Sequence, residues 1–439
     1  MSAGSIRAEA EVRLHGEPVG AVAELAHGRI FFEYTEAFRN RGLEISPVHL
    51  PTSLDVPVAF DPLRDLPAFR GLPGVLADAL PDEWGRRVIR AHLAARGESH
   101  RTGNLSPVEA LTLLGERALG ALTFHPPDPV FAAEASRAPL DVTALVQAAS
   151  RILEGGTRAD DREVLRIAAP AGGRLPKALV LYDVAAGVIR SGFARPGPGD
   201  VPCVLKFDGL RAGSPGPRTG PPVHEVGRPL PFNRVEAAYG EMARAAGIET
   251  SGITVYETDG YAHLLVRRFD LDGERRIHQH TLAGLLHADH DEPGLVSYED
   301  YLRTILRLGM PPAAVEQGFR RMVFNVMAVN HDDHPKNLSF HLGEDGEWKL
   351  APAYDLTFAR GSRWTGEHQM RVGDKTSGIT RADLLEVART FAVKRAGGIL
   401  DEVRDAVSRW KGFARRFGVP PVSRDAVEEA LEGRGGELG

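Results

Sequence analysis

The stretch from residue 330 to residue 355 decides the fold and reads NHDDHPKNLSFHLGEDGEWKLAPAYD. It opens with a dense polar string, 330–337, which directly follows an almost wholly apolar run. Residues 338–342 then alternate between apolar and polar, which predicts a strand, and 348–351 return as a second strand after a glycine-containing turn. The pattern therefore predicts the end of a buried helix, a polar loop and a β-hairpin in succession.

The hairpin is expected to bring polar side chains from its two ends together. Asn337 precedes the first strand and Asp355 follows the second. Since paired strands lie roughly 4.8 Å apart, both residues reach the same end of the hairpin, and Asp332 lies just before Asn337. Oxygen ligands of this kind suit Mg²⁺. The catalytic loop of protein kinases has the same Asp-x-x-x-x-Asn spacing, followed by a metal-binding Asp across a hairpin.

Two other interpretations of the polar string are open. Asp, Asn and His are common in loops because their side chains cap turns and helices. His331 and His334 are also candidate ligands of a transition metal, but their spacing does not resemble the helical H-x-x-x-H arrangement. The tandem of string, hairpin and Asp355 favours the catalytic interpretation.

A kinase-like site also needs a cation for the nucleotide phosphates. In the predicted strand PCVLKFD, Lys206 stands among apolar residues, where a lysine is costly to bury without an anionic partner. Glu236, on a predicted helix over 233–246, is a candidate partner for Lys206. The alternative is an edge strand that leaves Lys206 in solvent.

A glycine turn precedes the predicted strand 177–182, and its residues are candidates for phosphate binding. They are Gly172, Gly173, Arg174 and Lys177. Two glycines alone are weak evidence for a phosphate loop, so an ordinary solvated turn is equally consistent.

The 439 residues predict two or three domains. A proline-rich linker is expected at 127–139, which separates an N-terminal domain, 1–126, from a larger part that is β-rich over 140–268 and helical over 269–439. The glycine-rich tail, 432–439, is expected to fray.

Composition and charge narrow the class of protein. The single cysteine, Cys203, excludes an intramolecular disulfide framework and fits a reducing, cytoplasmic setting. No uninterrupted apolar run is long enough to span a membrane. A net charge of −6 argues against a protein that binds nucleic acid over its whole surface.

The chain resembles the HipA family of serine/threonine kinases, the toxin half of HipBA toxin–antitoxin systems. Matching segments occur in order along nearly the whole chain. They are ALPDEWGRR, LLGERALGALTF, GGRLPKALV, CVLKFD, NRVEAAYGEMARAAGI, LLVRRFD, NVMAVNHDDHPKNLSF and LAPAYDL. The resemblance implies an α+β, two-lobed protein-kinase-like fold, with a β-rich N-lobe, a helical C-lobe and an additional small N-terminal α/β subdomain.

The resemblance also implies roles for the residues of the polar string. Asp332 would be the catalytic base, and His334 and Lys336 would complete the catalytic loop, with Lys336 facing the transferred phosphate. Asn337 and Asp355 would hold Mg²⁺.

The nucleotide site implied by the resemblance lies elsewhere in the sequence. Lys206 would contact the ATP phosphates. The RRFD segment would be the hinge between the lobes, so that the backbone groups of Arg267 and Phe269 would meet the adenine. At Arg267 the family often has Glu.

Members of this family are held inactive by HipB, a helix-turn-helix antitoxin that binds operator DNA, so DNA would be contacted mainly through the antitoxin. Their protein substrates lie in translation, notably aminoacyl-tRNA synthetases. Many members switch themselves off by phosphorylating a Ser or Thr in the glycine loop. Here no Ser or Thr occurs between Arg158 and Arg190, so we expect this switch to be absent.

Two functions other than protein phosphorylation are also compatible with the sequence. The acceptor could be a small-molecule or lipid hydroxyl, although no basic amphipathic segment near a terminus supports a lipid. The chain could also be a non-catalytic scaffold that regulates transcription with a helix-turn-helix partner. The presence of Asp332, Asn337, Asp355 and Lys206 argues against the scaffold.

Overall fold

The computed structural model describes residues 5–101, 103, 105–128, 136–156, 167–168, 175–210, 231–361 and 363–438. The chain divides into two compact units. The first comprises the described residues of 1–214, 257–280 and 284–287, and the second comprises those of 215–256, 281–283 and 288–439. None of the helices in these ranges has the length and apolar content needed to cross a bilayer.

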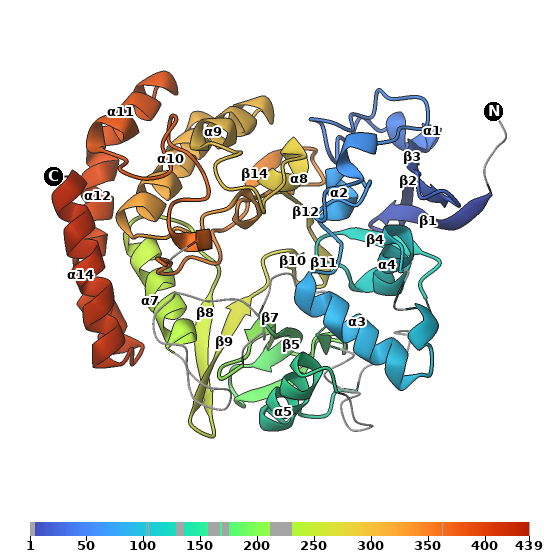
Figure 1. Cartoon of the computed structure of the whole chain (residues 1–439), viewed down its shortest axis with the longest axis horizontal. Coiled ribbons are helices and arrows are strands. Elements are labelled where there is room, and N and C mark those ends of the chain that lie inside the picture. The colour runs from blue at the N-terminus through green and yellow to red at the C-terminus, as the bar shows by residue number, and fades with distance from the viewer. Residues whose placement is uncertain are drawn as a thin grey trace. The chain divides into compact units, whose positions relative to one another are not determined.

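The first unit begins with an antiparallel sheet in the order β3-β2-β1-β4 (Figure 1). Its strands are β1 (Ile6–Leu14), β2 (Glu17–Leu25), β3 (Ile30–Tyr34) and β4 (Leu122–His125). The turn between β1 and β2 needs a left-handed backbone, which Gly16 supplies with a φ of 84°. Alternation along β1 directs Val12 and Leu14 into the core.

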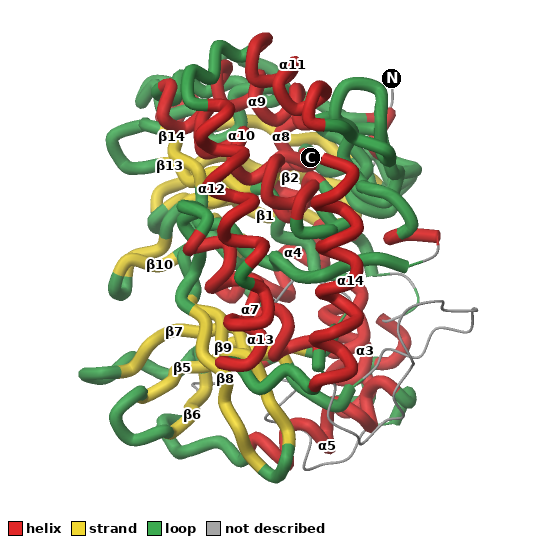
Figure 2. The backbone as a smooth tube through the Cα atoms, turned by 90° about the vertical axis from the view of Figure 1, so that its left-hand side faces the viewer, coloured by secondary structure: helices red, strands yellow, loops and turns green. Residues whose placement is uncertain are grey.

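A second sheet of this unit runs in the order β6-β5-β7-β9 (Figure 2), and β8, whose last residues belong to this unit, lies at its edge. The strands are β5 (Lys177–Asp183), β6 (Val188–Ser191), β7 (Asp200–Lys206), β8 (Ile253–Thr258) and β9 (Tyr261–Arg267). Residues 178–181 of β5 are completely buried, as their continuous apolar run requires.

Helices and short strands complete the first unit. The helices are α1 (Glu36–Arg39), α2 (Gly74–Ala77), α3 (Glu83–Ala95), α4 (Pro107–Leu114) and α5 (Val142–Leu153). The short strands are β10 (Leu271–Asp272), β11 (Arg275–Arg276) and β12 (His278–Thr281), and α8 (Leu282–Leu286) follows them; residues 281–283 of β12 and α8 belong to the second unit. Ser106 forms a capping box with Glu109 and thereby starts α4.

The segment around α2 packs against residues near the end of this unit. The backbone N–H of Gly74 donates to His287 Nε2 at 3.0 Å. His280 lies with its Nδ1 2.6 Å from Asp78 Oδ2, and its Nε2 lies 3.0 Å from Ser46 Oγ. These contacts leave no room for a larger residue at position 74, because a Cβ there would lie 1.9 Å from the carbonyl oxygen of Gly284.

The second unit is mainly helical. Its helices are α7 (Phe232–Ala245), α9 (Tyr298–Arg307), α10 (Pro312–Met327), α11 (Arg381–Thr390), α12 (Ala396–Ser408), α13 (Trp410–Arg416) and α14 (Pro421–Leu438). Tyr239 of α7 packs edge-on against Trp410, with ring centroids 5.3 Å apart, and its hydroxyl donates to the carbonyl oxygen of Ala328. The apolar faces of these helices therefore form the core of this unit.

The expectation of a frayed tail is wrong. Helix α14 continues to Leu438 and lies alongside α12 (Figure 1). Arg434 fastens it, because its guanidinium donates to the carbonyl oxygens of Val326 at 3.2 Å and Ile379 at 2.7 Å. These tertiary hydrogen bonds outweigh the low helix propensity of the glycines.

Candidate active site

The polar string begins where helix α10 ends. The helix is buried along its second half, and the chain leaves it through Val329, whose φ of 53° is unusual for a β-branched residue. Residues 335–337 then form a short 3₁₀ turn. Asp355 also has a positive φ, of 52°. Backbone strain of this kind is concentrated at functional sites, and here it occurs on both sides of the hairpin.

The predicted hairpin is present. Its strands are β13 (Ser339–Leu342) and β14 (Trp348–Leu350), with Leu342 opposite Trp348. Tyr354 closes its open end, because its hydroxyl donates to the carbonyl oxygen of Lys336 at 2.6 Å and lies 2.6 Å from Ser339 Oγ. The residues that enter and leave the hairpin are therefore held together.

Asn337 and Asp355 line the same small cavity, as the hairpin geometry predicts. Asn330, Asp333 and Arg321 also lie on its wall. Asn330 contributes a buried amide oxygen that has no hydrogen-bond partner among the residues the structure describes. A cavity bordered by a carboxylate and amide oxygens is chemically suited to a hard cation such as Mg²⁺.

The described ranges hold no group of three or more His, Cys, Asp or Glu side chains arranged to bind a metal ion. The oxygen set of Asn337 and Asp355 nevertheless fits Mg²⁺, which keeps several waters and uses few protein ligands. His331 is engaged elsewhere, since its Nδ1–H donates to the carbonyl oxygen of Thr365 at 3.0 Å. Burial, and after it the neighbouring His368, lowers the pKa of His331 to about 4.

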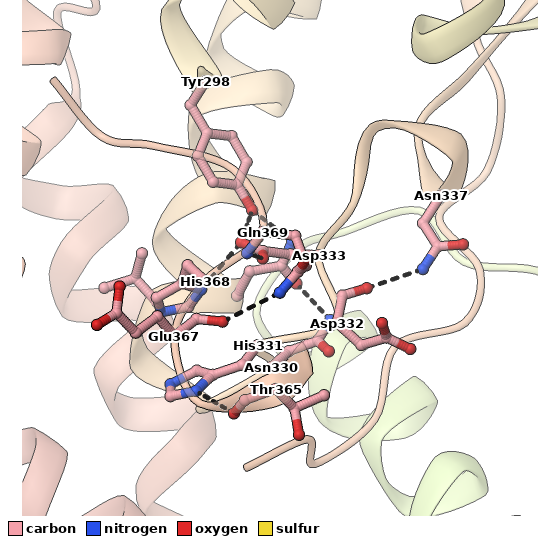
Figure 3. A network of polar contacts seen from close by, with 12 residues as sticks. Tyr298, Asn330, His331, Asp332, Asp333, Asn337, Thr365, Glu367, His368 and Gln369 are labelled. Atoms are coloured by element: carbon pink, nitrogen blue, oxygen red, sulfur yellow. Dashed lines mark hydrogen bonds and ion pairs between the residues drawn. The ribbon is translucent and has the colours of Figure 1, made fainter. Parts of the chain in front are cut away.

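Asp332 is placed differently from the two cavity residues. Its backbone carbonyl accepts from Asn337 Nδ2 at 3.0 Å, which leaves the amide oxygen of Asn337 to face a cation (Figure 3). One carboxylate oxygen, Oδ1, accepts from the indole N–H of Trp364 at 2.7 Å. The Asp332 side chain is 39% exposed, so an acceptor hydroxyl can reach it from solvent.

His334 and Lys336 flank this carboxylate along the chain. His334 Nε2 lies 4.0 Å from Asp332 Oδ1. Burial lowers the pKa of His334. The negative charges of Asp332 and Asp355 raise this pKa and the positive charge of Lys336 lowers it, and the net effect is a lowered pKa. The imidazole is therefore held neutral at physiological pH.

The nucleotide residues predicted in the first unit lie on its second sheet. Lys206 ends β7 and stands directly opposite Lys177 of β5, which is buried. Arg267 ends β9 with its side chain exposed, and Phe269 follows it.

Three residues of the predicted phosphate-binding turn, Gly172, Gly173 and Arg174, lie outside the residues that the structure describes. Glu236 lies on α7 in the second unit, whereas Lys206 belongs to the first, and their pairing stays a prediction.

Sequence reasoning missed the buried partners of Asp333. This residue is 2% exposed, and its carboxylate accepts from the Tyr298 hydroxyl, the His368 imidazole and the backbone N–H of Gln369 (Figure 3). Asp333 belongs to the polar string, but its partners are some 35 residues distant in both directions. No local pattern connects them.

Comparison with known proteins agrees with this architecture. The profile of the HipA N-terminal domain matches residues 10–125, and that of the HipA-like C-terminal domain matches 169–410. A chain of the Shewanella oneidensis MR-1 complex of HipA, HipB and operator DNA is similar with a TM-score of 0.63 and 16% identity, over 97% of this chain and 95% of that chain. The predicted α+β, two-lobed fold is thereby confirmed.

Other similarities are weaker. The Helicobacter pylori proinflammatory kinase CtkA aligns at 10% identity over 61% of this chain and 90% of that chain, with a TM-score of 0.38, which is too low to bear on the fold. No curated protein sequence matches the chain. The C-terminal profile alone spans more than half of the 439 residues, and the chain therefore belongs to the HipA family.

Proposed function

We propose that this chain is a Mg-ATP-dependent protein serine/threonine kinase and the toxin of a toxin–antitoxin pair. The observation that carries the proposal is the closed mouth of the hairpin, where Asn337 and Asp355 line one cavity and Asn337 is bonded to Asp332. Membership of the HipA family supports it. A non-catalytic scaffold has no need of this convergence.

The roles of the chain's own residues follow from their chemistry. Asp332 accepts the proton of the acceptor hydroxyl, and the Trp364 N–H on Oδ1 leaves Oδ2 for that proton. Asn337 and Asp355 would hold Mg²⁺, which supplies charge neutralisation for the phosphates when bound. Catalysis then consists of positioning and charge stabilisation, without a covalent enzyme intermediate.

Cations of the chain complete the phosphate site in this proposal. Lys206 contacts the ATP phosphates, and Lys177 adds a second positive charge from the opposite strand. Lys336, next to Asn337, faces the transferred phosphoryl group. The backbone of Arg267 and Phe269 meets the adenine.

The partners we propose are a HipB-like helix-turn-helix antitoxin and a protein of translation such as an aminoacyl-tRNA synthetase, which would place the chain in the cytoplasm. The similar Shewanella chain comes from a complex with HipB and operator DNA. The net charge of −6 favours DNA contact mainly through the antitoxin.

Expression in a bacterial host tests this function. The wild-type chain is expected to arrest growth and to add phosphate to serine or threonine of a translation protein, whereas Asp332→Asn, at equal expression, does neither. Phosphoproteomics and growth curves measure the two effects. Equal arrest by both chains would favour the scaffold, and arrest with a phosphorylated lipid or metabolite in place of a protein would favour the alternative acceptor.

A further inference from the structure

The segment 364–369, which follows Asp355 along the chain, is bonded to consecutive residues of the polar string. Figure 3 shows the bonds of Thr365, His368 and Gln369. His331 Nδ1–H donates to the carbonyl oxygen of Thr365 at 3.0 Å. The Trp364 indole donates to Asp332 at 2.7 Å, and the backbone N–H of Gln369 donates to Asp333 Oδ1 at 2.7 Å. Three consecutive side chains of the catalytic loop are therefore hydrogen-bonded to this segment.

Asp333 is the centre of this junction. Its second oxygen, Oδ2, accepts from His368 Nδ1 at 2.9 Å and from the Tyr298 hydroxyl at 2.7 Å. Tyr298 in turn accepts from Asn325 Nδ2 at 2.8 Å. A buried carboxylate is stable only when hydrogen-bond donors surround it in this way. If the carboxylate is removed, the buried donors lose their shared acceptor, which costs free energy.

The charge state of Asp333 agrees with this geometry. Burial raises the pKa of the carboxyl, but the adjacent His368 and the hydrogen bonds from His368, Tyr298 and Gln369 lower it more. The net effect is a lowered pKa, so the group is a carboxylate at physiological pH.

We propose that Asp333 fixes segment 364–369 to the catalytic loop in place of a phosphate group, so that the segment is positioned without being phosphorylated. In many protein kinases the segment after the metal-binding Asp is ordered by a phosphate that pairs with a cation. Here the anion belongs to the catalytic loop and the imidazole that donates to it, His368, belongs to the segment.

Asp333 and His368 are thus positioning residues, and they act on the proposed base through Trp364. The inference deepens the proposed function and rests on it only for the role of Asp332. A phosphate on Thr365 would add negative charge to a segment already bonded to two carboxylates, so phosphorylation there is expected to loosen the junction.

Hydrogen–deuterium exchange of the full-length chain tests the junction directly. In Asp333→Asn the backbone amides of 364–369 are expected to exchange about tenfold faster or more, because an amide N–H replaces the acceptor that His368 and Tyr298 share. The matched control is Asp200→Asn, which also removes a buried carboxylate, one paired with Arg190 and Arg137. It should leave exchange in this segment unchanged. Unchanged exchange in Asp333→Asn would overturn the inference.

A more conservative variant tests the same junction in case Asp333→Asn does not fold. Tyr298→Phe removes one donor and keeps the ring, so a smaller acceleration confined to 364–369 is expected, and acceleration spread through the chain would contradict the local role. In Tyr298→Phe, kcat for ATP turnover should fall while KM for ATP stays within about twofold, because Tyr298 does not line the cavity of Asn337 and Asp355.

Two further measurements distinguish a failure of this inference from a failure of the proposed function. Wild-type protein freed of phosphate by a phosphatase should keep its full rate, and loss of activity on that treatment would contradict the inference. A wild-type chain that neither binds nor turns over Mg-ATP would contradict the proposed function, while the exchange comparison would still decide the role of Asp333.

Discussion

Replacing Asp332 by Asn is expected to lower the rate of phosphoryl transfer about 10³-fold, the size of effect that a general base supplies. The substitution keeps an oxygen that can accept the Trp364 N–H, so the local structure is preserved while the proton acceptor is lost. Affinity for Mg-ATP should change by no more than about twofold, because Asp332 does not line the cavity of Asn337 and Asp355. The initial rate of ADP formation measures the effect.

A matched control lies on the same hairpin. Asp345 is 53% exposed and accepts from the backbone N–H of Glu347 in the turn between the strands. Asp345→Asn should therefore leave the rate unchanged. An Asp332→Asn chain that turned over ATP as fast as this control would exclude Asp332 as the base.

Gly74→Ala is expected to destabilise the protein by about 3 kcal/mol, the upper part of the range for overpacking. A Cβ at this position would lie 1.9 Å from the carbonyl oxygen of Gly284 and 2.8 Å from its Cα. Backbone atoms cannot rotate away as side chains do, so the segment around α2 has to move. Urea denaturation measures the change in the free energy of unfolding.

Gly433→Ala is expected to have the opposite effect on stability. Position 433 lies in the interior of α14, and no atom lies within 4 Å of an added Cβ. Alanine there should raise the free energy of unfolding by about 0.5 to 1 kcal/mol, since glycine is the poorer helix former. Equal stability of the two variants would show that the close approach of residues 74 and 284 is absent in solution.

Local signals in the sequence predicted much of this fold. The β1–β2 hairpin follows from alternation around His15-Gly16, and the capping boxes of Ser106, Ser297 and Thr380 mark the starts of α4, α9 and α11. The convergence of Asn337 and Asp355 was also predictable, because a hairpin of known length brings its ends together.

The parts that sequence could not predict depend on distant partners. Asp333 binds Tyr298 and His368, and nothing local to either residue indicates the contact. The tail is a similar case, since its glycines predict fraying, whereas the tertiary hydrogen bonds of Arg434 and the burial of Leu431 and Leu438 hold it helical. Long-range contacts therefore decided both outcomes.

The central claim, that Asn337 and Asp355 hold the Mg²⁺ of an ATP site, is tested most directly by thermal unfolding with ATP, with and without Mg²⁺. A ligand that binds only the folded state raises Tm. Asp355→Asn is the variant of choice, because Asn tolerates the positive φ of residue 355 and removes the charge. We predict a Mg²⁺-dependent rise of Tm in the wild type that is lost in Asp355→Asn. A rise that is independent of Mg²⁺, or equal in both proteins, would contradict the account.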